Sequence, residues 1–215
     1  PTVRRPVLVA VLCAAGSRVT TGPAGLGALR SLPYPLGFAV DSALADAAER
    51  VARYRAAGFE VLAMIDLPQG AAPGDAETSL AVTLDDLDGV VGVLEGTEGG
   101  LQGSRAVADQ VSEILAQSGH GLVTQDKGLN TMPKLARQSG VPADPVFRDF
   151  DSKGQSATVI RRFLDQAAFK AGQEGAVIML GRLRPDTVSA LLLWGLQDRA
   201  NDVALVPISS VLLRE

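Results

Sequence analysis

The sequence predicts an α/β fold in which parallel strands alternate with helices, and three observations support this prediction. Short apolar runs rich in Val, Ile and Leu recur along the chain, and patterns typical of amphipathic helices separate them. The composition, 47% hydrophobic and 20% charged over 215 residues, is that of an ordinary globular protein. No internal repeat or linker is visible. We therefore expect residues 1–215 to form one domain, with helices outside a parallel sheet that is open or closed into a barrel.

The strands are predicted from runs that are apolar along their whole length, as strands buried on both faces should be. Residues 7–12, with the sequence VLVAVL, are the clearest case. The other runs are residues 36–40, 60–65, 90–94, 121–125, 145–147, 176–180 and 202–206. Together they predict seven or eight β-α units.

The helices between these strands are predicted from capping residues and chain breakers. Asp41 or Ser42 can cap a helix that runs to about Ala57, where Gly58 closes it. Pro185 suits the first turn of a late helix that runs to about residue 197. Other helices are expected near residues 24–31, 84–87, 104–117, 132–139 and 156–173, whereas residues 71–78 are expected to be a loop.

The fold class also predicts where a functional site should lie. In a parallel β/α barrel the functional loops follow the C-terminal ends of the strands. Those loops are expected to begin near Cys13, Asp41, Asp66, Glu95, Asp126, Gly181 and Pro207.

The residue counts exclude several kinds of chemistry. The chain has one histidine, His120, and one cysteine, Cys13, which are too few for a His-based zinc site. We expect His120 to be structural or exposed, because it precedes a strand, and Cys13 to be a buried thiol. The net charge of −4, with no run of Lys and Arg longer than two, indicates that the chain does not bind nucleic acid.

The first residues allow two interpretations. Arg4 and Arg5 followed by an apolar run resemble a short signal peptide, but a buried first strand is the favoured interpretation. No stretch is long and apolar enough for a transmembrane helix. A natural precursor could carry an export signal or anchor before Pro1.

Several short motifs, taken in order, resemble the divergent polysaccharide deacetylase family. They are LPYPLGFAV at 32–40, DAAERVARYRAAGFEVLAMIDLP at 46–68, GSR at 103–105, GLVTQD at 121–126, IMLGRLRPDT at 178–187 and VALVPISSVL at 203–212. The resemblance covers nearly the whole chain. It implies an irregular (β/α) barrel of the polysaccharide deacetylase type, with seven or so parallel strands, and an exported, periplasmic or envelope-facing protein of the Gram-negative type.

The resemblance also implies a chemistry, which this sequence departs from. In the wider superfamily a metal held by Asp and two His activates water for hydrolysis of an N-acetyl group. The family's Asp-Asp pair, its middle His and its two late His residues match, in that order, Cys13, Ala14, Leu101, Arg182 and Arg184. Only the acidic residue after the fifth strand, Asp126, is kept. We therefore expect a pseudoenzyme that holds no metal and no other cofactor.

Arg182 and Arg184 are candidate ligand-binding residues, because two guanidinium groups after one strand could bind a carboxylate or phosphate. The alternative is that they pair with Asp186 or Glu174 at the surface. Asp126 is either a vestigial ligand or a residue that caps a helix or loop.

The glycine-rich segment 95–103 precedes two further candidates, Ser104 and Arg105. It could cradle an anion at a helix N-terminus, but it lacks the spacing of nucleotide-binding loops. A flexible loop with Ser104 as the N-cap is the favoured interpretation. Glu95 and Glu98 are expected to be solvated rather than an acid–base pair.

Three functional hypotheses remain open. The leading one is a non-catalytic envelope domain that binds a glycan, peptidoglycan or a protein partner, with Asp41 and Asp66 added to the candidate binding residues. The second is a residual hydrolase of acylated polysaccharide that uses Asp126 with Asp41 or Asp66. The third is a cytosolic β/α domain unrelated to the family.

Overall fold

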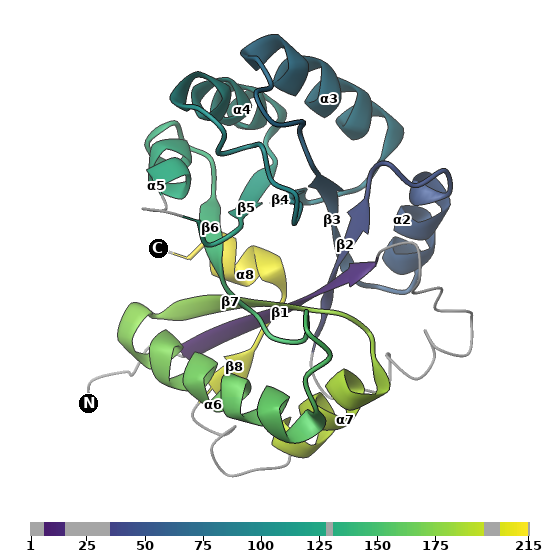
Figure 1. Cartoon of the computed structure of the whole chain (residues 1–215), viewed down its shortest axis with the longest axis vertical. Helices are drawn as coiled ribbons and strands as arrows, with labels where there is room; N and C mark the ends of the chain where they lie inside the picture. The colour runs from purple at the N-terminus through teal and green to yellow at the C-terminus, as the bar shows by residue number, and fades with distance from the viewer. Residues whose placement is uncertain (1–6, 16–34, 128–130, 196–202, 215) are drawn as a thin grey trace. The chain divides into compact units, whose positions relative to one another are not determined.

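The computed structural model describes residues 7–15, 35–127, 131–195 and 203–214 (Figure 1). They belong to two compact units. The first comprises Pro1–Gly37 and Phe147–Glu215, and the second comprises Phe38–Val146. The helix predicted near residues 24–31 lies outside the described residues. The organisation of residues 1–215 as one domain stays a prediction.

The second unit is built on neighbouring strands in the order β2-β3-β4-β5-β6. Their bounds are Gly37–Asp41, Glu60–Ile65, Gly92–Glu95, Gly121–Thr124 and Ala143–Asp149, and β6 continues into the first unit. The pairs β3–β4, β4–β5 and β5–β6 are parallel, as the sequence predicts. Because the strands are parallel, the residues that follow β3, β4 and β5 emerge at one edge of this sheet.

The helices of this unit are α2 (Ala47–Ala56), α3 (Pro73–Asp86), α4 (Arg105–Ser118) and α5 (Thr131–Gln138). Helix α4 packs between α3 and α5, and Figure 1 shows the three side by side. Their buried faces meet the strands in one apolar cluster, which includes Leu80, Val93, Leu101, Val111 and Met132. This cluster is the core that fixes the positions of the loops after β3, β4 and β5.

Two helices of this unit begin elsewhere than predicted. Helix α2 begins at Ala47 rather than near Ser42, because the Asp41 carboxylate accepts the backbone N–H of Ala43 at 3.0 Å and closes a turn instead. Helix α3 begins inside the predicted loop 71–78, with Pro73 in its first turn. There the Asp75 carboxylate accepts the N–H of Ala72 at 2.7 Å, which stabilises the early start.

The first unit has β1 (Val7–Ala15) between β7 (Ala176–Gly181) and β8 (Val203–Leu205). Both pairings are parallel, with Ala10 opposite Ile178 and Cys13 opposite Gly181. The first strand is therefore longer than the predicted run 7–12. Ala10, Val11, Cys13 and Ala14 of β1 are all buried, as expected for a central strand.

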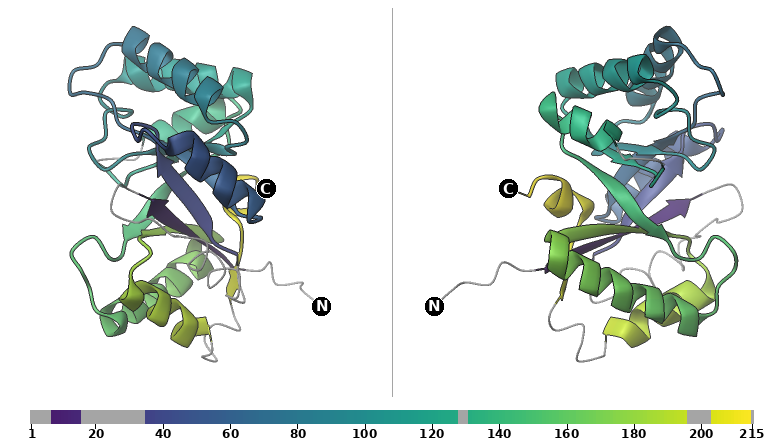
Figure 2. Two further views of the ribbon diagram at one scale, coloured as in Figure 1. Left: turned by 90° about the vertical axis from the view of Figure 1, so that its right-hand side faces the viewer. Right: turned by 60° about the vertical axis from the view of Figure 1, so that its left-hand side comes forward.

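Helices α6 (Ala157–Glu174), α7 (Pro185–Gly195) and α8 (Ile208–Leu212) cover these strands. Helices α6 and α7 lie together on one side of β1 and β7, and α8 lies on the other side (Figures 1 and 2). The short helix α8 is not predicted by the sequence pattern, since it spans only five residues. None of the helices in the described ranges is both long and apolar enough to cross a bilayer.

A buried tryptophan ties α7 to α6. The Trp194 indole is fully buried, and its N–H donates to the Asp165 carboxylate at 3.0 Å. Burying an indole is favourable only when its N–H finds an acceptor, and Asp165 supplies one. This hydrogen bond joins α7, the helix that follows Arg182 and Arg184 along the chain, to α6.

Candidate functional site

A cluster of charged side chains lies at the end of β7 in the first unit. Gly181 is the last residue of β7 and lies opposite Cys13 of β1. Arg182 follows directly, and β6 brings Asp149 and, two residues later, Asp151. Gly181 is required here by a close approach, because a Cβ at this position would overlap the Phe150 ring. The absence of a side chain therefore lets the β6 loop reach the end of β7.

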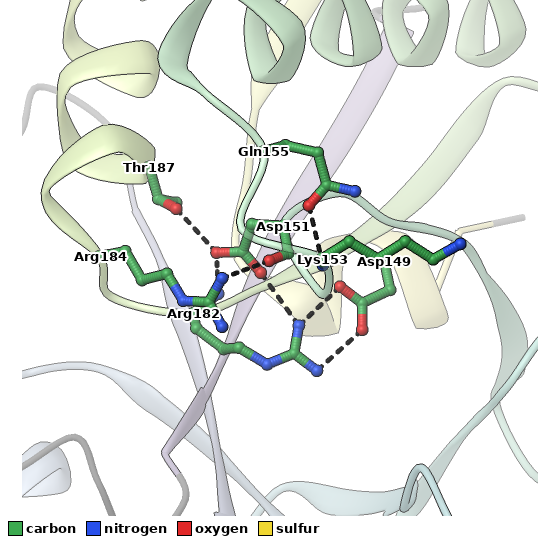
Figure 3. A network of polar contacts seen from close by, with 7 residues as sticks. All are labelled: Asp149, Asp151, Lys153, Gln155, Arg182, Arg184 and Thr187. Atoms are coloured by element: carbon green, nitrogen blue, oxygen red, sulfur yellow. Dashed lines mark hydrogen bonds and ion pairs between the residues drawn. The ribbon is translucent and has the colours of Figure 1, made fainter.

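Arg182 forms a bidentate ion pair with Asp149 (Figure 3). Its Nη1 lies 2.6 Å from Asp149 Oδ1 and its Nη2 lies 2.8 Å from Asp149 Oδ2. The same Nη1 donates to Asp151 Oδ1 at 2.9 Å. The hydrogen bonds and charge of Asp149, with those of Asp151, raise the pKa of the Arg182 guanidinium against the opposing effect of burial. The side chain is thus a fixed cation held by two carboxylates.

Asp151 is the buried member of this cluster, with a side chain that is 1% exposed. Its Oδ2 accepts the backbone N–H of Arg182 at 2.8 Å and the Thr187 hydroxyl at 2.7 Å. Its backbone carbonyl accepts Nη1 of Arg184 at 2.6 Å. Each buried oxygen therefore has a donor, as a buried carboxylate requires.

The partners predicted for these arginines from the sequence are wrong. Neither Asp186 nor Glu174 pairs with Arg182 or Arg184; Glu174 instead pairs with Lys170 at 2.6 Å. The predicted partners are near in sequence, whereas β6 and β7 bring the distant DFD segment, residues 149–151, to the end of β7. The available signal was a pair of acidic residues, Asp149 and Asp151, shortly after the predicted strand 145–147.

Cys13 lies at the same end of β1 and is fully buried, as predicted. Burial, assisted by the negative charge of Asp151, raises the pKa of the Cys13 thiol to about 12. The thiol is therefore protonated at neutral pH. A protonated thiol is neither a nucleophile nor a good metal ligand.

In the second unit, a carboxylate that the sequence predicts to be solvated is buried at the end of β4. Glu95 is fully buried rather than solvated. Its Oε2 accepts the Gln102 side-chain amide at 2.6 Å and the backbone N–H of Gln125 at 3.0 Å. The Gln125 amide in turn donates to the Glu95 carbonyl at 2.7 Å. Glutamines from the loop after β5 and from the glycine-rich segment thus supply hydrogen-bond donors to the buried Glu95 carboxylate.

The glycine-rich segment 95–103 is held to the end of β3. The Gly99 N–H donates to Asp66 Oδ1 at 2.7 Å, and the Leu67 N–H donates to the Gly99 carbonyl at 2.9 Å. Gly100 has a φ of 100°, and a Cβ there would overlap the Leu67 carbonyl. Glycine is therefore required at this close approach. The segment is anchored at several points, in contrast to the flexible loop that was expected.

The remaining predicted residues have separate roles. Ser104 caps α4, as predicted, because its Oγ accepts the Val107 N–H at 3.2 Å. Arg105 is exposed at the first residue of α4. Asp126 is exposed after β5. His120 contacts the Ser118 hydroxyl at 3.0 Å, just before the start of β5, which agrees with a structural histidine.

The positions that match the family's metal ligands can be tested for fit with a divalent cation. Leu101 is fully buried in the apolar cluster and has no donor atom. Arg182 is a cation, and a cation repels a metal ion at the place of a histidine ligand. Across the part of the chain that the structure describes, no three His, Cys, Asp or Glu side chains are grouped to hold a metal ion. These residues do not fit the family's metal.

Comparisons with known proteins bear on both the family and the fold. A profile of the divergent polysaccharide deacetylase family matches residues 20–212, which confirms the family resemblance found in the motifs. A search of curated proteins gave no significant match.

Solved structures are similar over nearly the whole chain. An uncharacterized protein from Agrobacterium tumefaciens is 17% identical, with a TM-score of 0.74 over 96% of this chain and 89% of that one. A peptidoglycan N-acetylglucosamine deacetylase is 15% identical, with a TM-score of 0.60 over 96% and 88%. A domain of a multidomain xylanase from the hindgut metagenome of Trinervitermes trinervoides is 13% identical, with a TM-score of 0.59 over 95% and 88%. The predicted (β/α) barrel of the polysaccharide deacetylase type is confirmed.

Proposed function

The chain belongs to the divergent polysaccharide deacetylase family, and we propose that it is a non-catalytic member that binds a glycan of the cell envelope. The observation that carries this proposal is Arg182. It stands where the family places a histidine, and it is held in a bidentate ion pair with Asp149. A permanent cation cannot replace a metal ligand.

Two further observations support the absence of metal-assisted hydrolysis. Leu101, at the position of the family's middle histidine, contributes to the apolar core and not to a polar site. The Cys13 thiol, at the first position of the family's Asp-Asp pair, has its pKa raised to about 12 and stays protonated. A metal site needs deprotonated ligands, and these positions supply none.

The alternative of a residual hydrolase needs Asp126 together with Asp41 or Asp66. Asp41 accepts the N–H of Ala43, and Asp66 accepts the N–H of Gly99. Both carboxylates thus have a role in closing or anchoring their own loops. A carboxylate already engaged in a loop is less available as a general acid or base, which supports the proposed absence of hydrolysis.

A glycan is the proposed ligand because of the family and because one similar structure is a peptidoglycan N-acetylglucosamine deacetylase. We further propose that the protein acts in the periplasm or another exported location. Fractionation of cells that express the full-length protein would test the location, and recovery in the cytosol alone would contradict it.

Metal analysis, hydrolysis and binding test the function separately. The purified chain, exposed to zinc or cobalt and then dialysed, is expected to retain substoichiometric metal by mass spectrometry. It is expected to release no acetate from N-acetylchitooligosaccharides or peptidoglycan with either metal added. It is also expected to sediment with insoluble peptidoglycan. Stoichiometric binding of metal, or release of acetate, would favour the hydrolase if it is lost in Asp126→Ala. A lack of sedimentation with peptidoglycan would contradict glycan binding.

A further inference from the structure

A surface hollow of about 340 Å³ lies between the starts of α4 and α5 in the second unit. Its apolar lining comes from Ala108 and Met132, which are buried, and from Leu135, which is half-buried. Its polar lining comes from Gln102, Ser104, Arg105, Thr131, Lys134 and Gln138. Small-molecule sites typically have volumes of about 300–1,000 Å³ and an apolar lining with a few fixed polar groups. The hollow has the size and lining for a sugar residue.

The charge of this hollow differs from that of the whole chain. Arg105 and Lys134 are exposed cations in its lining, and the described lining residues include no carboxylate. The chain as a whole has a net charge of −4. Arg105 Nε lies 3.5 Å from the Asp109 carboxylate, and both side chains are more than half exposed. A pair this exposed is weak, so Arg105 can exchange it for a ligand anion.

One wall of the hollow is rigid. The Gln102 side-chain amide donates to Glu95 at 2.6 Å and to the Gln125 carbonyl at 2.9 Å, which uses both of its hydrogens. The buried Glu95 carboxylate therefore holds the Gln102 side chain in place in the lining of the hollow, and a fixed group loses little entropy on binding.

From this lining we propose that the hollow binds a sugar ring that carries a carboxylate. The ring lies against Met132 and Leu135, and the carboxylate pairs with Arg105 and Lys134. The inference rests on the proposed glycan binding and makes it specific, because it selects acidic saccharides over neutral ones.

The test compares two probes by titration calorimetry at low salt. The first is the disaccharide of N-acetylglucosamine and N-acetylmuramic acid, whose lactyl group has a free carboxylate, and the second is its methyl ester. Arg105→Gln and Lys134→Gln are each expected to weaken binding of the acid about tenfold, the loss expected for one charge-assisted hydrogen bond. Binding of the ester should change little in either variant. Gln138→Trp, at the exposed end of α5, is expected to weaken both probes by filling the hollow.

The matched control is Lys170→Gln, which removes an exposed lysine of α6 in the first unit. It should bind the acid as the unmodified chain does. Equal affinity for acid and ester, with no effect of Arg105→Gln or Lys134→Gln, would overturn the inference while glycan binding stands. Failure of both probes and of peptidoglycan sedimentation would overturn both proposals. Competition by inorganic phosphate at concentrations similar to the acid would indicate an anion site without sugar selectivity and would also overturn it.

Discussion

Replacing Arg182 by methionine tests whether the ion-pair cluster stabilises the fold. The substitution Arg182→Met keeps much of the side-chain length but removes three hydrogen bonds, two to Asp149 and one to Asp151. The Asp151 side chain is 1% exposed, and its carboxylate keeps the hydrogen bonds from the Thr187 hydroxyl and the Arg182 backbone N–H. The variant therefore leaves a buried negative charge without its cation.

The size of the effect follows from the exposure of each group. Removing one partner of a fully buried ion pair costs about 3–5 kcal/mol. The side chains of Asp149 and Arg182 are each 21% exposed, so Asp149 regains some hydration in the variant. We therefore expect a loss of about 2–4 kcal/mol in the free energy of unfolding, less than for a fully buried pair. For a chain of this size, each kcal/mol lowers the melting temperature by about 2–4 °C.

Urea unfolding followed by circular dichroism measures this loss, with Lys170→Met as the matched control. Lys170 also pairs with a carboxylate, but both partners are more than a third exposed, so we expect a change of less than about 1 kcal/mol. The double variant Arg182→Met with Asp149→Asn should lose less than the sum of the two single losses. A loss for Arg182→Met no larger than for Lys170→Met would refute the view that Asp151 depends on this cation.

Three other predictions concern buried positions. Cys13 should resist a thiol reagent at pH 8 in the folded chain and react after denaturation. Because folding raises the pKa of its thiol from 9.0 to about 12, the stability that this group contributes is present below pH 9 and is lost between pH 9 and 12. In urea unfolding at alkaline pH, Cys13→Ala should therefore reduce the dependence of stability on pH. Leu101→Ala should lower stability by about 2–5 kcal/mol in urea unfolding, as expected for a buried leucine, whereas a loss below about 1 kcal/mol would contradict its place in the core. Gly181→Ala should cost about 1–3 kcal/mol by overpacking against Phe150, and Phe150→Leu in the same chain should recover part of that loss.

Much of the fold was predictable from the sequence, because its strands are apolar along their length and glycine or proline marks many of their boundaries. The strand at Glu60–Ile65 has the predicted bounds, and Gly58, with a φ of 89°, follows α2 as expected. Helix starts were less predictable. At Asp41 two local structures compete for one carboxylate, a helix cap and a tight turn, and the pattern does not show which is formed.

The candidate site was harder to predict, because its contacts join residues far apart in sequence. Arg182 meets Asp149 and Asp151 across 33 and 31 residues. Glu95 meets Gln125 across 30 residues. From the sequence pattern alone, a glutamate after an apolar run is expected to face solvent, because unpaired buried carboxylates are rare. The donors that Gln102 and Gln125 supply to the buried Glu95 carboxylate become visible only in the tertiary structure.

The same contacts are consistent with the binding role that we propose. A catalytic acid, base or nucleophile needs an accessible group that exchanges a proton near the working pH. The Cys13 thiol keeps its proton, and the carboxylates of Asp151 and Glu95 are buried and hydrogen-bonded. By contrast, Arg105 and Lys134 are exposed beside an apolar hollow. Such side chains donate hydrogen bonds and attract anions without changing protonation, which is the chemistry that the proposed binding role needs.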